Sequence, residues 1–132
     1  YWLIKTEPST WSWENQREHK VTAWDGVRNF QAANNLKSMS VDDLCFFYHS
    51  VSDKKIMGIV QVIKPYYPDP SDETGRFGMV DVIYKQSFNK PVSLQVIKSH
   101  PQLQTLALVK QSRLSVMPVD PQSWDIILNL SR

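Results

Sequence analysis

The sequence predicts a single α+β domain spanning residues 1–132. Of these residues, 42% are hydrophobic and 11% aromatic, which suits one globular core and leaves no room for two full domains. Five or so short segments show the apolar or alternating pattern of β-strands, and short helical patterns lie between them. Because strands and helices do not alternate regularly, the pattern favours an α+β fold over a doubly wound sheet.

The first part of the chain predicts a strand, a short helix and a loop. Residues 1–5 form an apolar run that ends before Pro8, which cannot donate a hydrogen bond to a sheet ladder. Ser9, Thr10 and Ser12 are favourable N-caps for a short helix over residues 14–18, which two neighbouring tryptophans would dock against the core. A loop then carries residues 24–29.

A longer helix and two strands follow. Apolar side chains recur every three or four positions in residues 29–39, which predicts a helix with Asn29 as its N-cap. The apolar and aromatic residues 44–50 predict a buried strand. Residues 56–63 predict the next strand, in which Gly58 indicates a bulge or a close backbone approach.

A proline-rich stretch and an exposed loop separate these strands from the next one. Pro65, Pro68 and Pro70 exclude a helix there, and the polar residues 69–78 predict the loop. Apolar and polar side chains alternate again in residues 79–84, which predicts another strand.

The last third predicts helical segments around one strand. Residues 93–98 predict a short capped helix, and the apolar residues 103–109 predict a further helical segment. Residues 114–117 predict the last strand. The final helix has the clearest boundary signals, with Asp120 as its N-cap and Pro121 in its first position.

Composition excludes several kinds of site. One cysteine cannot form an internal disulfide or a four-cysteine zinc site, and Cys45 lies in an apolar strand, where an inert thiol is expected. The three histidines lie too far apart in sequence for a metal motif, and no serine occupies a Gly-x-Ser-x-Gly motif. The glycines form neither a P-loop nor a dinucleotide fingerprint. We therefore expect no metal and no cofactor.

The same composition favours a reducing compartment. A single thiol is typical of proteins that keep no disulfides. No run of about 18 apolar residues is present, so we expect no membrane partner, and no charged leader precedes Tyr1. We therefore expect a cytoplasmic protein, or a nuclear one in a eukaryote.

Basic residues are concentrated in one segment. The net charge is only +2, but residues 82–119 hold no acidic residue and five basic ones, Lys85, Lys90, Lys98, Lys110 and Arg113. Such asymmetry can mark a surface that faces nucleic acid, although spaced lysines on a solvated face are commoner. Lys85, Lys98, Lys110 and Arg113 are the candidate phosphate contacts.

An aromatic and polar group of residues suggests a binding site. Trp24 lies in a loop beside Asp25, Arg28 and Asn29, and Tyr48-His49-Ser50 lies where the buried strand should emerge. Flat aromatic rings beside amides and hydroxyls suit a planar heterocycle, because the ring stacks while the polar groups read its edge. The alternative is that Trp24 is a core residue and Arg28 a surface ion-pair partner.

Several motifs, in this order, resemble the EVE domain family over essentially the whole chain. They are Lys5-Thr6-Glu7-Pro8, Trp24-Asp25-Gly26-Val27-Arg28-Asn29-Phe30-Gln31-Ala32, Phe46-Phe47-Tyr48-His49-Ser50, Tyr67-Pro68-Asp69-Pro70, Val80-Asp81-Val82 and Arg113-Leu114-Ser115-Val116. The resemblance implies a PUA-like fold, a small mixed β-barrel of about five to six strands flanked by short helices, similar to YTH and ASCH domains. It also implies a non-catalytic module that binds nucleic acid, DNA or RNA. Such a module would read a modified base, such as methylated or oxidised cytosine, by taking a flipped nucleotide into a pocket.

The resemblance further implies a set of base-pocket residues. By similarity to YTH readers, Trp24 would form a wall of an aromatic cage, with edge-reading groups nearby. The candidates are Lys5, Thr6, Glu7, Pro8, Trp24, Arg28, Asn29, Gln31, Tyr48, His49 and Ser50. Phe30 and Ala33 stand where the family often has a tyrosine and an arginine, which removes a hydroxyl and a cation.

Two other functions stay open on the sequence. The first is a small amidohydrolase-like enzyme acting on a modified nucleoside, because Lys5, Thr6 and Glu7 supply an amine, a hydroxyl and a carboxylate. On an extended strand, however, Lys5 and Glu7 share one face and Thr6 points to the other. The second is an interaction domain or a domain that binds a small metabolite. The sequence predicts no oligomeric state.

Overall fold

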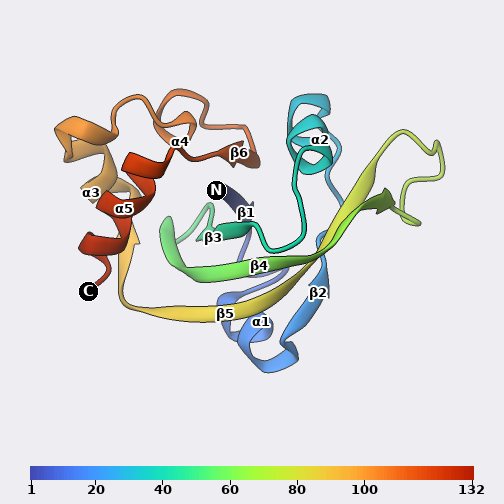
Figure 1. The fold of residues 1–132 in the computed structure, drawn as a ribbon, viewed down its shortest axis with the longest axis horizontal. Helices are drawn as coiled ribbons and strands as arrows, with labels where there is room; N and C mark the ends of the chain where they lie inside the picture. The colour runs from blue at the N-terminus through green and yellow to red at the C-terminus, as the bar shows by residue number, and fades with distance from the viewer.

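Six β-strands and five α-helices make up the computed structural model, which describes all residues from 1 to 132 (Figure 1). In chain order they are β1 (Trp2–Thr6), α1 (Trp13–His19), β2 (Val21–Ala23), α2 (Phe30–Lys37), β3 (Leu44–His49), β4 (Lys55–Pro68), β5 (Gly78–Ser93), α3 (Leu94–Ser99), α4 (Ala107–Lys110), β6 (Val116–Pro118) and α5 (Pro121–Leu130). A short 3-10 turn, Pro101–Leu103, precedes α4. Helices α3, α4 and α5 gather at one end of the sheet, and the connection between β4 and β5 reaches out at the other.

The strands form one mixed sheet. Their order is β2-β5-β4-β3-β1-β6, in which β1 and β3 pair in parallel and all other neighbours pair antiparallel. The predicted α+β class and strand number are confirmed. The outer strands β2 and β6 do not pair with each other, so the sheet stays open, and β4 and β5 follow a curved path across it (Figure 1).

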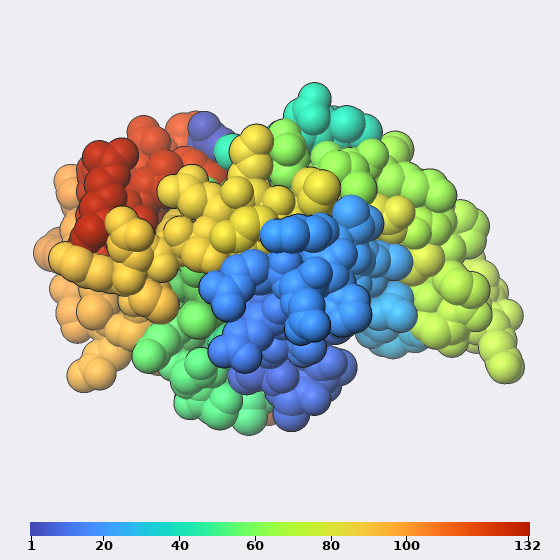
Figure 2. All heavy atoms as spheres, turned by 90° about the horizontal axis from the view of Figure 1, so that it is seen from below, coloured from blue at the N-terminus to red at the C-terminus, as the bar shows by residue number.

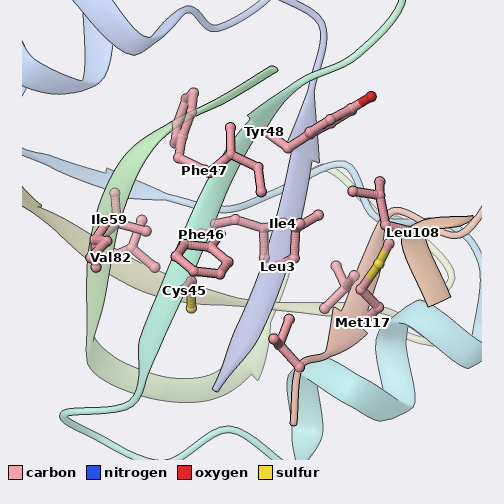
Figure 3. Close-up of a cluster of buried hydrophobic side chains, with 14 of the residues drawn as sticks. Leu3, Ile4, Cys45, Phe46, Phe47, Tyr48, Ile59, Val82, Leu108 and Met117 are labelled. Carbon is pink, nitrogen blue, oxygen red and sulfur yellow. The ribbon is translucent and has the colours of Figure 1, made fainter. Parts of the chain in front are cut away.

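The central strands β1 and β3 carry the core. β3 buries every side chain from Cys45 to His49, as the sequence predicts for a strand covered on both faces. Figure 3 shows Phe46 of β3 beside Leu3 and Ile4 of β1. Trp124 of α5 stacks on Phe46 with their ring centroids 3.8 Å apart. Because each such side chain contributes about 1.5–3 kcal/mol on burial, this cluster holds β1, β3 and α5 together.

Gly58 of β4 lies where backbone and a tryptophan ring come close together. The pairing register of β4 shifts at this point. A Cβ atom at Gly58 would collide with the Trp13 ring and with the carbonyl oxygen of Gln86. Both the bulge and the close approach that the sequence indicates are therefore present, and they let α1 pack against the sheet.

Four of the five helices, α1, α2, α3 and α5, begin at capping residues that the sequence offers. In each case the side chain of the N-cap accepts a hydrogen bond from a backbone N–H in the first turn, and the four caps are Ser12, Asn29, Ser93 and Asp120. Pro121 occupies the first turn of α5. The starts of these helices are therefore decided locally.

The structure differs from the sequence prediction in several places. β4 runs to Pro68, past the predicted end at residue 63, because it keeps pairing with β5 through Tyr67 and Pro68. The helical segment predicted over residues 103–109 is instead a 3-10 turn at Pro101–Leu103 followed by α4 at Ala107–Lys110.

β2 is an additional strand of three residues, none of them buried, so the sequence carries too short a pattern to predict it, and its pairing with the backbone of β5 defines it. β5 continues to Ser93, well past the predicted end at residue 84, because it also pairs with the start of β4. The loop at residues 69–77 is only partly exposed, since Asp69 and Phe77 are buried. No helix combines the length and the apolar character needed to cross a membrane.

Candidate functional site

A small cavity lies where the end of β1, the segment before α1 and the loop after β2 meet. Its volume is about 190 Å³, and its lining residues are Lys5, Thr6, Thr10, Trp11, Thr22, Ala23, Trp24 and Asp25. We call it the tryptophan cavity. One water occupies about 30 Å³ of liquid, and pockets for drug-sized ligands begin near 300 Å³. The tryptophan cavity therefore has room for one small ring system.

Two tryptophans, Trp11 and Trp24, are the aromatic residues that line it. Trp24 is 7% exposed, and its ring meets Phe47 edge-on, with centroids 5.5 Å apart and an interplanar angle of 80°. Its backbone N–H also donates to the carbonyl oxygen of Val80 at 2.7 Å. The Trp11 indole N–H donates to Gln16 Oε1 at 2.9 Å. Both rings are thus held in place by the protein before any ligand binds.

The cavity also presents hydrogen-bonding groups of both kinds. Lys5 Nζ donates to the carbonyl oxygen of Ser112 at 2.9 Å, and burial lowers the pKa of the Lys5 ammonium. An ammonium has three donors, so the others stay available. Thr10 and Thr22 add hydroxyls, and Asp25 adds an exposed carboxylate. The site can therefore donate to ring nitrogens and carbonyls and can accept from an amino group.

A buried carboxylate clamps the loop that carries Trp24. Asp69 Oδ2 accepts hydrogen bonds from the Gly26 backbone N–H at 2.9 Å and from Arg28 Nη1 at 3.2 Å. Burial alone would raise the pKa of Asp69, but hydrogen bonds from Ser71, Gly26 and Arg28 outweigh it and lower this pKa to about 2. Asp69 therefore stays ionised and holds the loop from beneath.

The structure distributes the predicted base-pocket residues over several places. Lys5, Thr6 and Trp24 come together in the tryptophan cavity. Arg28 does not join them, because its guanidinium pairs with Asp69 and donates to Ser71 Oγ at 3.0 Å. This ion pair is the alternative that the sequence left open for Arg28. The other half of that alternative also holds, because Trp24 belongs to the main hydrophobic core cluster while it lines the cavity.

His49 has a structural environment. Its Nε2 accepts a hydrogen bond from the Trp13 backbone N–H at 2.9 Å, and its Nδ1 lies 3.1 Å from Asp53 Oδ2. Pro8 and His49 line a separate hollow next to Trp13. Glu7 is exposed and lines neither that hollow nor the tryptophan cavity.

The remaining candidates line two further hollows. The α2 hollow, of about 310 Å³, is lined by Asn29, Gln31, Lys110, Gln111, Ser112, Arg113 and Leu114. The central hollow, of about 180 Å³, is lined by Lys5, Tyr48, Ser50, Val51, Lys54, Leu94, Lys98, Leu108 and Ser112. Three of the predicted phosphate contacts, Lys98, Lys110 and Arg113, thus lie in these hollows. Lys85 lies in neither.

Sequence reasoning missed several lining residues of the tryptophan cavity. Trp11 carried a usable signal, because its sequence neighbours on both sides are hydroxyl residues. An aromatic residue in such a polar stretch is not typical of a buried core position. Thr22 and Ala23 carried none, since they belong to β2, which only tertiary pairing creates. Asp25 belongs to the polar group that the sequence places beside Trp24, but it was not among the predicted base-pocket residues, and it lines the cavity.

The chain is similar to proteins of known family. The family profile described as EVE domain matches residues 1–130. Thymocyte nuclear protein 1 of Rattus norvegicus is 32% identical over 98% of this chain and 73% of that protein. The structure of protein Atu2648 from Agrobacterium tumefaciens has a TM-score of 0.95 at 38% identity, covering 99% of this chain and 92% of that one. Human THYN1 protein in complex with 5-methylcytosine containing DNA has a TM-score of 0.92 at 30% identity, covering 99% and 96%.

Proposed function

Because the chain belongs to the EVE domain family, we propose that it is a non-catalytic module that binds a modified base of nucleic acid in the tryptophan cavity. The observation that carries this proposal is the cavity itself, in which two indole rings, several donors and one carboxylate surround room for a single ring. The similar human protein that binds 5-methylcytosine containing DNA supports a modified cytosine as the ligand.

Stacking provides the non-selective part of the affinity. A base that stacks on an aromatic side chain gains about 1–3 kcal/mol, whichever base it is. Trp24 is suited to this role because Phe47 and the backbone of Val80 already fix its position. Little conformational entropy is then lost when the ligand arrives.

The polar lining provides the selective part. A carboxylate accepts hydrogen bonds from the exocyclic amino group of cytosine, and Asp25 is the carboxylate of this cavity. The hydroxyl of Thr10 or Thr22 and the ammonium of Lys5 can donate to the ring nitrogen and carbonyl oxygen of the same base. Uracil and thymine lack the amino group, so the lining disfavours both.

Entry of the base requires that it leave its stack. Flipping costs a few kcal/mol and costs least for a single-stranded or mismatched base. Stacking on Trp24 and two or three hydrogen bonds can offset this cost. We therefore expect tighter binding to single strands than to duplexes.

The cavity supplies no activated nucleophile. Thr6 Oγ1 donates to the backbone carbonyl oxygen of Trp11 at 3.1 Å, and Lys5 Nζ donates to that of Ser112 at 2.9 Å. Activation of Thr6 requires a base within hydrogen-bond reach, and these contacts direct the two groups to different carbonyls. The geometry thus favours binding over the hydrolysis of a modified nucleoside.

Tryptophan fluorescence tests the proposal directly. Wild type, Trp24→Ala and Trp11→Ala are titrated with cytidine, 5-methylcytidine, further modified nucleosides and short single strands, after circular dichroism has verified each fold. We expect saturable quenching by a modified base, weakened about 5- to 150-fold in either variant. Trp2→Phe is the control, because the Trp2 indole bonds Asp43 outside the cavity. No saturable binding, or equal binding by Trp24→Ala, contradicts the proposal, and release of a product contradicts its non-catalytic part.

A further inference from the structure

Three further hollows are linked to the tryptophan cavity, or to one another, by shared lining residues. The central hollow shares Lys5 with the cavity and Ser112 with the α2 hollow. It also shares Lys54 and Lys98 with a third one, the α3 hollow, which Lys55 lines as well. In Figure 2 the turn around residues 50–54 lies at the surface between the blue N-terminal segment and the orange segment that contains α3. We call the surface of these three hollows the basic strip.

Positive charge dominates the basic strip. Its cations are Lys5, Lys54, Lys55, Lys98, Lys110 and Arg113. No carboxylate lines the central or the α2 hollow, and Asp53 is the one carboxylate of the α3 hollow. Asp53 is already bonded to His49 Nδ1. Uncompensated cations in a concave surface focus the field and attract anions.

The central hollow combines this charge with neutral donors. Lys5, Lys54 and Lys98 surround it together with the hydroxyls of Ser50 and Tyr48. Burial, with a further effect of the Asp53 charge, raises the pKa of Tyr48 to about 12, so this hydroxyl remains a donor. Figure 3 shows the Tyr48 hydroxyl pointing away from the buried side chains around it. Ammonium and hydroxyl donors around a small hollow suit a tetrahedral oxyanion.

We propose that the basic strip is a track for a phosphodiester backbone, with the central hollow holding the phosphate of the nucleotide whose base occupies the tryptophan cavity. This inference rests on the proposed function, because Lys5 lines both the cavity and the central hollow and so joins base to phosphate. Neighbouring phosphates on one side meet Lys110 and Arg113, and those on the other side meet Lys54, Lys55 and Lys98.

Salt dependence separates the strip from the cavity. Lys54→Gln with Lys98→Gln removes two cations of the strip without touching a residue of the tryptophan cavity. Lys37→Gln with Lys64→Gln is the matched control, because these exposed lysines line neither the cavity nor any of the three hollows. Each protein is titrated with the preferred modified nucleoside and with ten-residue DNA and RNA strands that carry the modification once, from about 50 to 200 mM salt.

Nucleoside binding should be unchanged in both double variants. On single strands each lost phosphate contact lowers the slope of log K against log salt by about 0.7, so the strip pair should lower it by about 1.4. Its affinity should then fall about sevenfold less than that of wild type across this salt range. Comparison of the DNA and RNA strands shows for which backbone the slope of log K against log salt changes.

The possible outcomes bear on the two proposals separately. Equal slopes in the strip pair and the control pair would overturn the phosphodiester track, even if the nucleoside binds as expected. Failure of every nucleoside to bind wild type contradicts the proposed function, while a slope that depends on Lys54 and Lys98 would still support the strip. If the variant with Lys54→Gln and Lys98→Gln stays folded but loses nucleoside binding, this would contradict the assignment of the base to the cavity and of the phosphates to the strip.

Discussion

The loop at residues 24–29 and the turn at residues 50–54 both border the proposed site, yet they are built in different ways. Both contain positive φ angles, at Gly26 (+78°) in the loop and at Val51 (+71°) and Lys54 (+47°) in the turn. Glycine adopts this conformation without steric cost, whereas a β-branched valine does not. The loop sequence thus matches its backbone conformation, and the turn sequence opposes it.

The carboxylates that hold the two regions also differ, in how deeply each is buried. Asp69, which clamps the loop, has a side chain with 0% exposure, and Asp53 in the turn has one with 40%. A buried, multiply bonded carboxylate fixes its neighbours far more firmly than an exposed ion pair. If the proposed roles hold, the loop would offer the base a preorganised wall, while most of the proposed phosphate contacts would come from exposed side chains that adapt to a strand.

The largest expected effect is the loss of the loop clamp. Asp69→Ala leaves the Gly26 N–H and Arg28 without their acceptor, so we expect the free energy of unfolding to fall by about 2–3 kcal/mol. Asp53→Ala should cost about 1 kcal/mol, because its pair with His49 is partly solvated. Urea unfolding of both variants measures the difference. Equal losses would show that the loop is no better anchored than the turn.

Low pH should remove the stability that ionised Asp69 contributes. The folded pKa of Asp69 is lowered to about 2 from 3.8, so its contribution is complete above pH 4 and disappears as the pH falls towards 2. We expect the stability gap between wild type and Asp69→Asn to shrink by about 2 kcal/mol over this window. Denaturant unfolding at pH 5, 4, 3 and 2 measures it. A gap that stays constant with pH would contradict the assigned pKa.

The substitution Gly26→Ala measures how much the positive φ of the loop costs a residue other than glycine. No atom lies within 4 Å of a Cβ built at Gly26, so Gly26→Ala meets no steric clash. The positive φ still costs an L-residue about 1–2 kcal/mol, and the lower entropy of the unfolded alanine chain offsets part of that. Thermal unfolding should therefore show a loss of about 1 kcal/mol. An unchanged or higher melting temperature would mean that the loop relaxes to another conformation.

The smallest expected effect has the opposite sign. Val51→Gly removes the strain at φ +71° from a side chain that is 66% exposed and buries little apolar surface. Glycine loses more entropy on folding, so we expect a net gain of about 0.5–1 kcal/mol. Thermal unfolding beside Gly26→Ala provides the contrast. A loss of stability would indicate that the Val51 side chain makes contacts that outweigh its strain.

Local sequence patterns were sufficient for the helix starts and for the central strand. Ser12, Asn29 and Asp120 cap their helices because a short polar side chain reaches its own first turn. The buried run of β3 was readable because five consecutive apolar or aromatic residues exclude a solvent face. The family motifs also located Trp24, Lys5 and Thr6, which the structure brings into one cavity.

The partners of polar side chains were not readable in this way. Arg28 meets Asp69 across 41 residues of sequence, and His49 meets Trp13 across 36. Neither contact leaves a periodic trace, because a hydrogen bond between distant segments depends on the fold and not on spacing. The same holds for Asp25 and Thr22, which reach the cavity only once β2 pairs with β5.

The sequence by itself determined where the capped helices α1, α2, α3 and α5 begin and which strand is buried, since caps and hydrophobic runs act within a few residues. The tertiary structure alone decided which polar groups share a cavity and which lysines share a hollow. The packing of α3 and α4 around the end of the sheet brings lysines that are far apart in the sequence, such as Lys54, Lys98 and Lys110, onto the basic strip. Electrostatic function of this kind depends on distances in space, and only the folded chain sets them.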